Sequence, residues 1–475
     1  MLELALIGQV SLWLIVIGVF LASGQASIHH PLGVYLAFHG IVFVLRPLLV
    51  ICLGFDEEWA YMQFEPSGIH LVRSLGASSV GLVAFALFGI AAGRTRTQFA
   101  VSVPPQFSTA QLHGLIITTI LLTPLILYSA RQAVSGGMQG RHIGGTYVLT
   151  GASGYILEAQ YMAGPLICAW LALTRFRWPA LALLLPWVVF RSYAGLARWT
   201  IVLLLVAITL VYAWQKRSKW LPTWAILAAI PVFLLFRTLG DNRAYFQQLW
   251  AGERQVEEVG QPGATRLEKL KAKYDNPDFA NFDYLTFIAA VVPERTGTYN
   301  YFSQYLTLFT EPIPRKLWPG KPAGAPVSFF NLNQYGDFLG RTYSLVGDGW
   351  ISGGWIGVVV TMGVAGLILG LAHRWFWRNS GDPWRSILYL VGLAMLPQWF
   401  RDGNISIAKF LFWNLSPLFL WAGISWLTGL RLVPAYSVLL PRECRVRLPS
   451  ATHTWKALGP SNGGRDLVPK QGMRG

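Results

Sequence analysis

Residues 198–215 read RWTIVLLLVAITLVYAWQ, and Lys216 and Arg217 follow directly. From Trp199 to Gln215 this stretch carries no charged side chain. A helix of about 20 mostly apolar residues crosses the hydrocarbon core of a bilayer. The stretch therefore predicts a transmembrane helix with basic residues at its carboxyl end.

Similar apolar segments occur on both sides of this helix. The eleven predicted spans are residues 4–23, 31–53, 73–93, 111–130, 154–174, 177–191, 198–215, 219–238, 350–372, 385–400 and 405–429. The sixth is short and contains Pro186, which predicts a bent or half-span helix. The fold class that follows is an all-α polytopic membrane protein.

Composition supports this class. Of the 475 residues 53% are hydrophobic and only 13% are charged, with a mean hydropathy of +0.44. A soluble domain carries about a quarter charged residues. The 21 Trp and 18 Tyr are of the kind that gathers at membrane interfaces.

Several other classes are excluded by the residues. The three cysteines, Cys52, Cys168 and Cys444, are too few and too scattered for a disulfide framework or a metal site. P-loop, HExxH and CxxC motifs are absent from the sequence. Glu3 precedes the first apolar run and the first Lys or Arg is Arg46, which predicts a span and not a cleavable signal peptide.

Basic residues in the short connections predict the orientation, because cytoplasmic loops are rich in Lys and Arg. One set of connections carries Arg94, Arg96, Arg175, Arg177, Lys216, Arg217, Lys219, Arg374, Arg378 and Arg385. Residues 431–475 add eight Lys or Arg against two acidic residues. This side is predicted to be cytoplasmic, with the N-terminus outside and the C-terminus inside.

The domain organisation has four parts. Residues 1–238 hold spans one to eight, residues 239–349 form a large extracytoplasmic loop, residues 350–429 hold the last three spans, and residues 430–475 form a basic cytoplasmic tail. The loop is nearly neutral, with eleven Lys or Arg and twelve Asp or Glu. A loop of this length in a compact protein is usually functional.

Within the loop, residues 241–255 and 265–274 are predicted helices. Aromatic and apolar residues then recur at helical spacing: Tyr299, Phe302, Tyr305, Leu306 and Phe309. Such a helix would lie in the membrane interface or pack against the bundle.

The run Glu311–Pro322, EPIPRKLWPGKP, contains four prolines and predicts a stiff, extended strap. Its cations Arg315, Lys316 and Lys321 stand beside Trp318. Arginine forms bidentate hydrogen bonds to phosphate oxygens and lysine acts as a point charge, so the strap is a candidate diphosphate site. The alternative is a basic turn that anchors the loop to lipid head groups.

Residues 347–357, GDGWISGGWIG, lead into the ninth span, and the glycines permit close backbone approach. Asp348 is a candidate general base or a helix cap.

Ionisable residues within or beside spans are costly in lipid and are candidates for function. They are His39, Arg46, Glu158, Arg191, Arg198, Arg237, Arg401, Asp402 and Lys409. An anionic ligand would compensate the cations among them. Internal ion pairs, such as Arg46 with Glu158, are the alternative.

Three of these stretches together resemble a family. The run IPRKLWPGKP late in a large outer loop, the run GDGWISGGWIGVVV before the next helix, and the arginine-bearing turn Arg191–Arg198 resemble the bacterial O-antigen or oligosaccharide repeat-unit polymerases and the related O-antigen ligases. Residues 239–349 contain no histidine, whereas the ligases carry one in that loop.

The resemblance implies a glycosyltransferase of the integral-membrane, GT-C-like type at the outer face of the bacterial plasma membrane. It would transfer a glycan from polyprenyl diphosphate to another lipid-linked repeat unit, without metal or cofactor, in lipopolysaccharide, capsule or exopolysaccharide synthesis. The implied catalytic residues are Arg191, Arg198 and Arg315, with Asp348 or Glu158 as base and with Asp241 and Asp402 as further carboxylates. The expected diphosphate-binding residues are Lys316, Lys321, Arg237, Arg341, Arg401, Arg46 and Trp318.

Expected partners are the lipid-linked glycan, membrane lipids, a chain-length regulator and a flippase, and not nucleic acid. A ligase-type transferase and a lipid-linked glycan flippase or transporter remain as alternatives. A transferase that uses a polyprenyl monophosphate sugar is disfavoured. That class usually carries an acidic motif in the first outer loop, directly after the first span, whereas the acidic residues 56–58 follow the second span.

Overall fold

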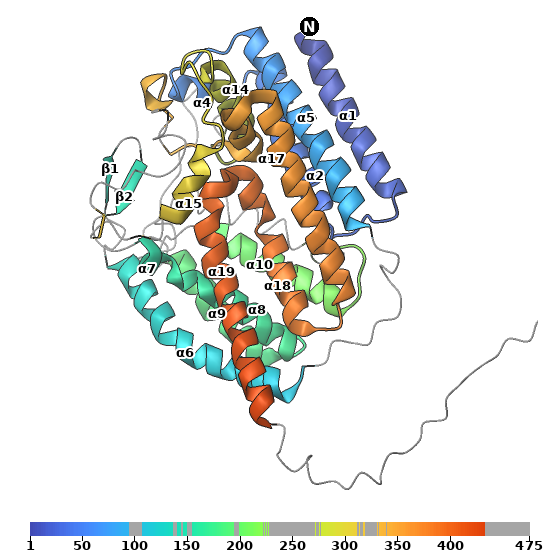
Figure 1. Cartoon of the computed structure of the whole chain (residues 1–475), viewed down its shortest axis with the longest axis vertical. Helices are drawn as coiled ribbons and strands as arrows, with labels where there is room; N and C mark the ends of the chain where they lie inside the picture. The colour runs from blue at the N-terminus through green and yellow to red at the C-terminus, as the bar shows by residue number, and fades with distance from the viewer. Residues whose placement is uncertain are drawn as a thin grey trace, which may run out of the picture. The chain divides into compact units, whose positions relative to one another are not determined.

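The computed structural model shows a largely helical, multi-pass membrane protein (Figure 1). The structure describes residues 1–94, 107–135, 140–143, 146–149, 154–193, 199–221, 223, 225, 227, 271, 275, 277–310, 313, 317–318, 330, 332–338 and 340–432. Met1–Leu430 form one compact unit.

The first half of the chain contains these elements: α1 (Leu2–Ala22), α2 (Pro31–His39), the π-helix η1 (Gly40–Leu45), α3 (Arg46–Leu53), α4 (Glu57–Tyr61), α5 (Gly68–Gly93), α6 (Thr109–Val134), α7 (Gly154–Glu158), the 3-10 helix η2 (Ala159–Met162), α8 (Ala163–Leu173), α9 (Trp178–Tyr193) and α10 (Trp199–Gln215). Between α6 and α7, β1 (Gly140–Ile143) pairs antiparallel with β2 (Thr146–Leu149), with Gly140 opposite Leu149.

The second half contains the short 3-10 helices η3 (Pro277–Phe279), η4 (Ser303–Leu306) and η5 (Leu332–Gln334), and the helices α14 (Asn281–Val291), α15 (Thr307–Thr310), α17 (Ser344–Arg378), α18 (Pro383–Ala394) and α19 (Leu396–Leu432).

Seven helices in the described part of the chain are long and apolar enough to cross a bilayer. They coincide with predicted spans one to five, nine and eleven. Shorter apolar helices at Leu181–Ser192 and Trp199–Gln215 coincide with the sixth and seventh, and α18 with the tenth. The eighth predicted span, residues 219–238, lies largely outside the described residues. The total of eleven therefore stays a prediction.

The helices α5 and α17 pack through glycine. A Cβ added to Gly366 would lie 2.4 Å from the carbonyl oxygen of Phe85, and one added to Gly370 would lie 2.7 Å from that of Gly89. Small residues allow such close backbone approach in membrane bundles, where packing replaces the hydrophobic effect. α1 packs on the same helix α5, and Figure 1 shows α1, α5 and α17 side by side.

Two long helices are broken by glycine. In α17, Gly353 and Gly354 leave the helical conformation, and Gly354 has a φ of 58°. A Cβ on Gly357 would collide with the backbone oxygen of Gly349, so the two arms of α17 meet at backbone contact. In α19 the break is at Gly403, with a φ of 81°. The sequence predicted one ninth span from residue 350, whereas the helix begins at Ser344 and is interrupted inside that span.

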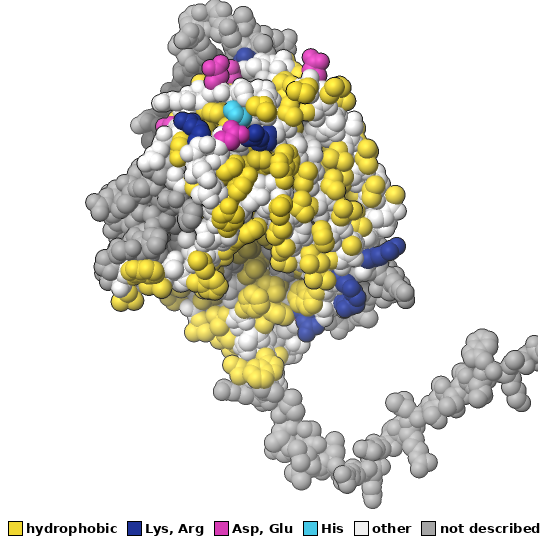
Figure 2. All heavy atoms as spheres, turned by 45° about the horizontal axis from the view of Figure 1, so that its top comes forward, with side chains coloured by type: hydrophobic (Ala, Val, Ile, Leu, Met, Phe, Trp, Pro, Cys, Tyr) yellow, Lys and Arg dark blue, Asp and Glu magenta, His cyan; other side chains and the backbone are white. Residues whose placement is uncertain are grey.

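The two ends of the bundle differ in charge. Helices α8, α10 and α17 end, and α18 begins, at the same end, because the side chain of Gln215 donates to the oxygen of Ala172 and that of Trp214 to the oxygen of Ser380. The start of α6 lies there too, since Gln111 donates to Asp382, and so does the end of α5, where Gly93 lies beside His373. We call it the basic end, since it carries Arg94, Arg175, Arg177, Lys216, Arg217, Lys219, Arg378 and Arg385. The other we call the acidic end, since it carries most described carboxylates. Figure 2 shows hydrophobic side chains over the middle of one face, between these polar margins.

Part of the predicted outer loop is buried inside the bundle. All eleven residues of α14 are buried, and the helix packs against α5 and α17. The predicted aromatic helix over residues 299–309 is wrong, because Tyr301 and Phe302 adopt positive φ and break the chain into a turn, η4 and α15. The predicted helix over residues 241–255 lies outside the described residues, as does all of 265–274 except Lys271.

Candidate functional site at the acidic end

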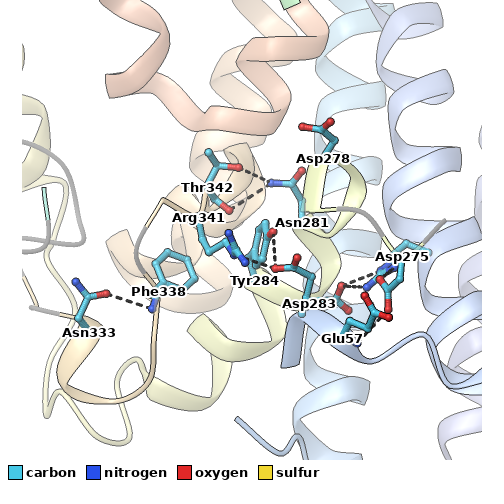
Figure 3. A network of polar contacts seen from close by, with 12 residues as sticks. Glu57, Asp275, Asp278, Asn281, Asp283, Tyr284, Asn333, Phe338, Arg341 and Thr342 are labelled. Atoms are coloured by element: carbon cyan, nitrogen blue, oxygen red, sulfur yellow. Dashed lines mark hydrogen bonds and ion pairs between the residues drawn. The ribbon is translucent and has the colours of Figure 1, made fainter. Parts of the chain in front are cut away.

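Arg46, in the second span, anchors a buried polar network. Figure 3 shows the part of it around Asp275, Asp283 and Arg341. Its guanidinium pairs with Asp275 and Asp283, each at 2.6 Å, and all three side chains are at most 3% exposed. A second oxygen of Asp275 accepts the backbone N–H of Glu57 at 3.0 Å. The predicted alternative, an ion pair of Arg46 with Glu158, is wrong. The long loop supplies the partners of Arg46, and Glu158 pairs with Lys409 at 2.8 Å.

Arg341 forms the second half of this network. Its Nε lies 2.8 Å from Glu58, whose carboxylate also accepts the Tyr284 hydroxyl at 3.0 Å. The guanidinium stands over the Tyr61 ring, 4.0 Å from its centre. These bonds connect the segment after the second span to α14 and to the segment before α17.

Burial dominates the electrostatics of the carboxyls here. It raises the pKa of Asp283 to about 7, against the opposing pull of Arg46. Burial likewise raises the pKa of Glu58, against Arg341. A carboxylate at this depth needs its cation. Arg46 and Arg341, predicted as diphosphate ligands, are therefore occupied in holding the loop to the bundle.

Asp348 joins the two broken helices. One carboxylate oxygen accepts from Gln304, and the other accepts the Tyr305 hydroxyl at 2.9 Å and the Asn404 amide at 2.7 Å. Asn404 follows the Gly403 break in α19, and Asp348 precedes the break in α17. The carboxylate is fully buried. The predicted role as helix cap is wrong, because Tyr343 is the N-cap of α17 and Asp348 lies within the helix.

Arg191 and Arg401 each contact one of the first two residues of α10. Arg191 donates to the hydroxyl of Thr200 at 2.8 Å, and the guanidinium of Arg401 lies 5.2 Å from the centre of the Trp199 ring. The sequence placed these arginines on different spans, with more than 200 residues between them. The bundle brings them to the first two residues of one helix, at the acidic end.

Arg191 is 1% exposed at the end of α9. It donates to Gln160 at 2.7 Å and stands over the rings of Tyr161 and Trp187, 5.4 and 5.7 Å from their centres. Beside it lies a cavity of about 30 Å³ whose lining includes Tyr161, Thr200 and Gln398. That volume has room for about one or two water molecules.

Arg401 has a different setting. It is 18% exposed and lies 3.5 Å from Asp278 and 3.7 Å from Asp402, longer than the ion pairs of Arg46. Both Arg401 and Asp278 line a larger, mostly apolar groove of about 410 Å³. The wall between this groove and the small cavity is built from the start of α10 and the region where α18 passes into α19.

The other predicted site residues divide into two groups. Trp318 is described and is 39% exposed, next to Leu317 at 79%. Arg198, Arg237, Arg315, Lys316 and Lys321 lie outside the described residues, and Asp241 does so too. Among the residues that the structure describes, no three His, Cys, Asp or Glu side chains form a group that would hold a metal ion.

Sequence reasoning missed the neutral residues around Arg191. Gln160, Tyr161 and Trp187 carry no sequence signal beyond their position near predicted helix ends, where Tyr and Trp commonly anchor a helix at the interface. Only the proximity of Gln160 to Glu158, a residue already selected, could have pointed to that turn.

Comparison of the chain with known protein families, with curated proteins and with solved structures finds no match. The resemblance to the repeat-unit polymerases therefore stays a prediction from three short stretches of sequence.

Proposed function

We propose that the protein is a membrane glycosyltransferase that polymerises polyprenyl-diphosphate-linked oligosaccharide repeat units at the outer face of the bacterial plasma membrane. The observation that carries the proposal is that Arg191 and Arg401 contact Thr200 and Trp199, the first two residues of α10, and that Arg401 lines an apolar groove. A helix amino end favours anions, and arginine binds phosphate. By the positive-inside rule we expect the basic end to face the cytoplasm and this site to face outward.

Transfer of the glycan breaks the bond between the anomeric carbon and the diphosphate oxygen. Negative charge builds on that oxygen as it leaves. Preorganised cations in a site with little water stabilise such charge strongly. Arg191 is held in place by Gln160, Thr200 and two aromatic rings, so little reorganisation is needed when the charge develops.

The acceptor hydroxyl loses its proton as it attacks the anomeric carbon, which is already cation-like, so a weak base suffices. Glu158 stands two residues before Gln160, the partner of Arg191, and its own cation is Lys409. The carboxylate of Asp348 already accepts hydrogen bonds from three side chains, those of Gln304, Tyr305 and Asn404. We therefore place Glu158 ahead of Asp348 as the base.

The test is polymer formation by the purified protein in liposomes supplied with a lipid-linked repeat unit. Arg191→Ala should abolish long products, and Arg191→Lys should retain part of the activity. The matched control is Arg295→Ala, which removes another arginine beside an aromatic ring, 5.0 Å from the centre of Tyr335. Equal polymer from the Arg191→Ala protein would refute the assignment.

The broken helices give a specific reason to keep a transporter as the second candidate. Transporters build substrate sites from discontinuous helices, and both α17 and α19 are interrupted. A flippase would move the lipid-linked unit from one leaflet of the liposome bilayer to the other without lengthening it. A ligase-type transferase would consume the donor only when a different acceptor lipid is added. The liposome assay separates all three.

A further inference from the structure

The groove beside Arg401 runs along the bundle from one end toward the other. Its lining begins near the basic end at Ile28 and Gly33, follows α2 and η1 to Val42, and finishes at Asp278 and Arg401. The helical part of this lining, from Gly33 to Val42, rises about 14 Å, which is roughly half of one bilayer's hydrocarbon thickness. The opposite wall comes from α10 and from α18. A chain-like apolar molecule fits this shape better than a compact one.

The groove opens sideways toward lipid. Ile41 and Val206 line it and are 44% and 36% exposed, within the apolar middle of their helices. The π-helix η1 lies at this point of the second span. Such widened turns often occur at functional sites. A lipid chain can therefore enter from the bilayer without crossing water.

The polar residues of the groove are gathered at its acidic end. Among the residues that the structure describes, the polar lining consists of Asp278 and Arg401, apart from Trp199, whose ring faces Arg401. Their separation of 3.5 Å leaves Arg401 less tightly held than Arg46, whose partners stand at 2.6 Å. A phosphate competes well for a partly exposed guanidinium, because it accepts paired, charge-assisted hydrogen bonds. An uncharged lipid gains nothing there.

We propose that this groove, between α2–η1 and α10–α18, binds the hydrocarbon chain of a polyprenyl phosphate lipid, with the phosphate at Arg401. The choice of a polyprenyl chain over other phosphate lipids rests on the proposed function. The groove itself is assigned from its apolar lining, its side opening and the cation Arg401 at one end.

The experiment uses the full-length protein in detergent and a photoreactive polyprenyl phosphate, with the matching prenol that lacks phosphate as the second probe. Ala37→Trp places a large ring in the middle of the groove. Leu121→Trp is the matched control, because Leu121 is 58% exposed on α6, away from the groove. We expect Ala37→Trp to lower labelling about tenfold, the equivalent of about 1.4 kcal/mol, and Leu121→Trp to leave it unchanged.

Arg401→Gln tests the head-group end. It should bring the labelling by the phosphate probe down to that of the prenol, while prenol labelling stays as in the wild type. Undiminished labelling of the folded Ala37→Trp protein would overturn the groove. So would a photoreactive phosphatidylglycerol that labels it as strongly as the polyprenyl phosphate, since the groove would then hold a structural phospholipid.

The two proposals fail separately. If Ala37→Trp blocks labelling but the wild-type protein makes no polymer in liposomes, the lipid-binding groove is supported and the polymerase proposal is contradicted. If the Ala37→Trp protein is labelled normally and the wild type polymerises, the polymerase proposal stands and the groove falls.

Discussion

At the scale of single residues, the arginines of the acidic end perform two kinds of work. Arg46 and Arg341 are matched to buried carboxylates and hold the long loop on the bundle. Arg191 and Arg401 stand at the start of α10, next to cavities. The sequence selected Arg46, Arg191 and Arg401 because a cation near lipid is unusual, and Arg341 as an expected diphosphate ligand. It could not separate them, because their partners come from residues up to 283 positions away, as Glu58 does for Arg341.

We expect Arg46→Met to destabilise the protein by about 3–5 kcal/mol, because it strands two buried carboxylates. The matched change is Arg73→Met, whose ion pair with Glu294 is partly exposed, at 22% and 48%. That variant should lose about 1 kcal/mol or less. Thermal unfolding of both proteins in the same detergent measures the difference. Equal losses would mean that the Arg46 network is no more than a surface contact.

Asp348→Asn should lower stability by about 1–3 kcal/mol, because an amide group would face donors that now bind a carboxylate oxygen. The unfolding temperature should fall, and polymer formation should fall with it. If the variant unfolds like the wild type yet makes no polymer, Asp348 acts as a base after all.

At the scale of elements, hydrophobic segments were predictable and their interruptions were not. The apolar runs fix where α1, α5 and α6 lie, because only helices satisfy backbone groups in lipid. The breaks at Gly354 and Gly403 depend on tertiary contacts. A Cβ on Gly354 would meet the Tyr299 hydroxyl at 2.7 Å, and one on Gly403 would meet the Tyr343 ring at 2.7 Å. No local sequence pattern predicts that these tyrosines contact the two glycines. The burial of α14 was missed for the same reason.

The turn between α1 and α2 predicts a pH dependence. Burial lowers the pKa of His29 to about 4, and burial also lowers the pKa of His30, with His373 adding to the effect. His29 stacks against Phe376, 5.9 Å between ring centres. Below pH 6.5 the unfolded chain takes up a proton that the folded chain refuses until about pH 4, so stability falls on acidification.

For His29 alone the loss between pH 6.5 and pH 5 is about 2 kcal/mol. Unfolding temperatures of the wild type in detergent should therefore drop over this range, and those of His29→Leu should drop less. A wild-type curve that is flat from pH 7 to 5 would contradict the burial of these imidazoles.

At the scale of the whole molecule, charge asymmetry orients the bundle. The basic end should face the cytoplasm and the acidic end, with Arg191, Arg401 and the groove mouth, should face outward. Cys52 tests this directly, because it is exposed at the end of α3, on the acidic side, whereas Cys168 is buried.

In a protein that keeps only Cys52, a membrane-impermeant maleimide should label intact spheroplasts. In a cysteine-free protein carrying Arg217→Cys, labelling should require opening the cells. The reverse pattern would put the site in the cytoplasm and would contradict the proposal of an enzyme that acts at the outer face.

The most direct test of the central claim is deletion of the gene, followed by electrophoresis of the cell's surface glycans. Complementation would use the wild type, Arg191→Ala, Arg315→Ala and the control Arg295→Ala. We predict single-repeat glycans without a long ladder in the deletion strain, rescue by the wild type and Arg295→Ala, and no rescue by Arg191→Ala or Arg315→Ala. An unchanged ladder in the deletion strain would contradict the polymerase proposal and favour a transporter or a single-sugar transferase.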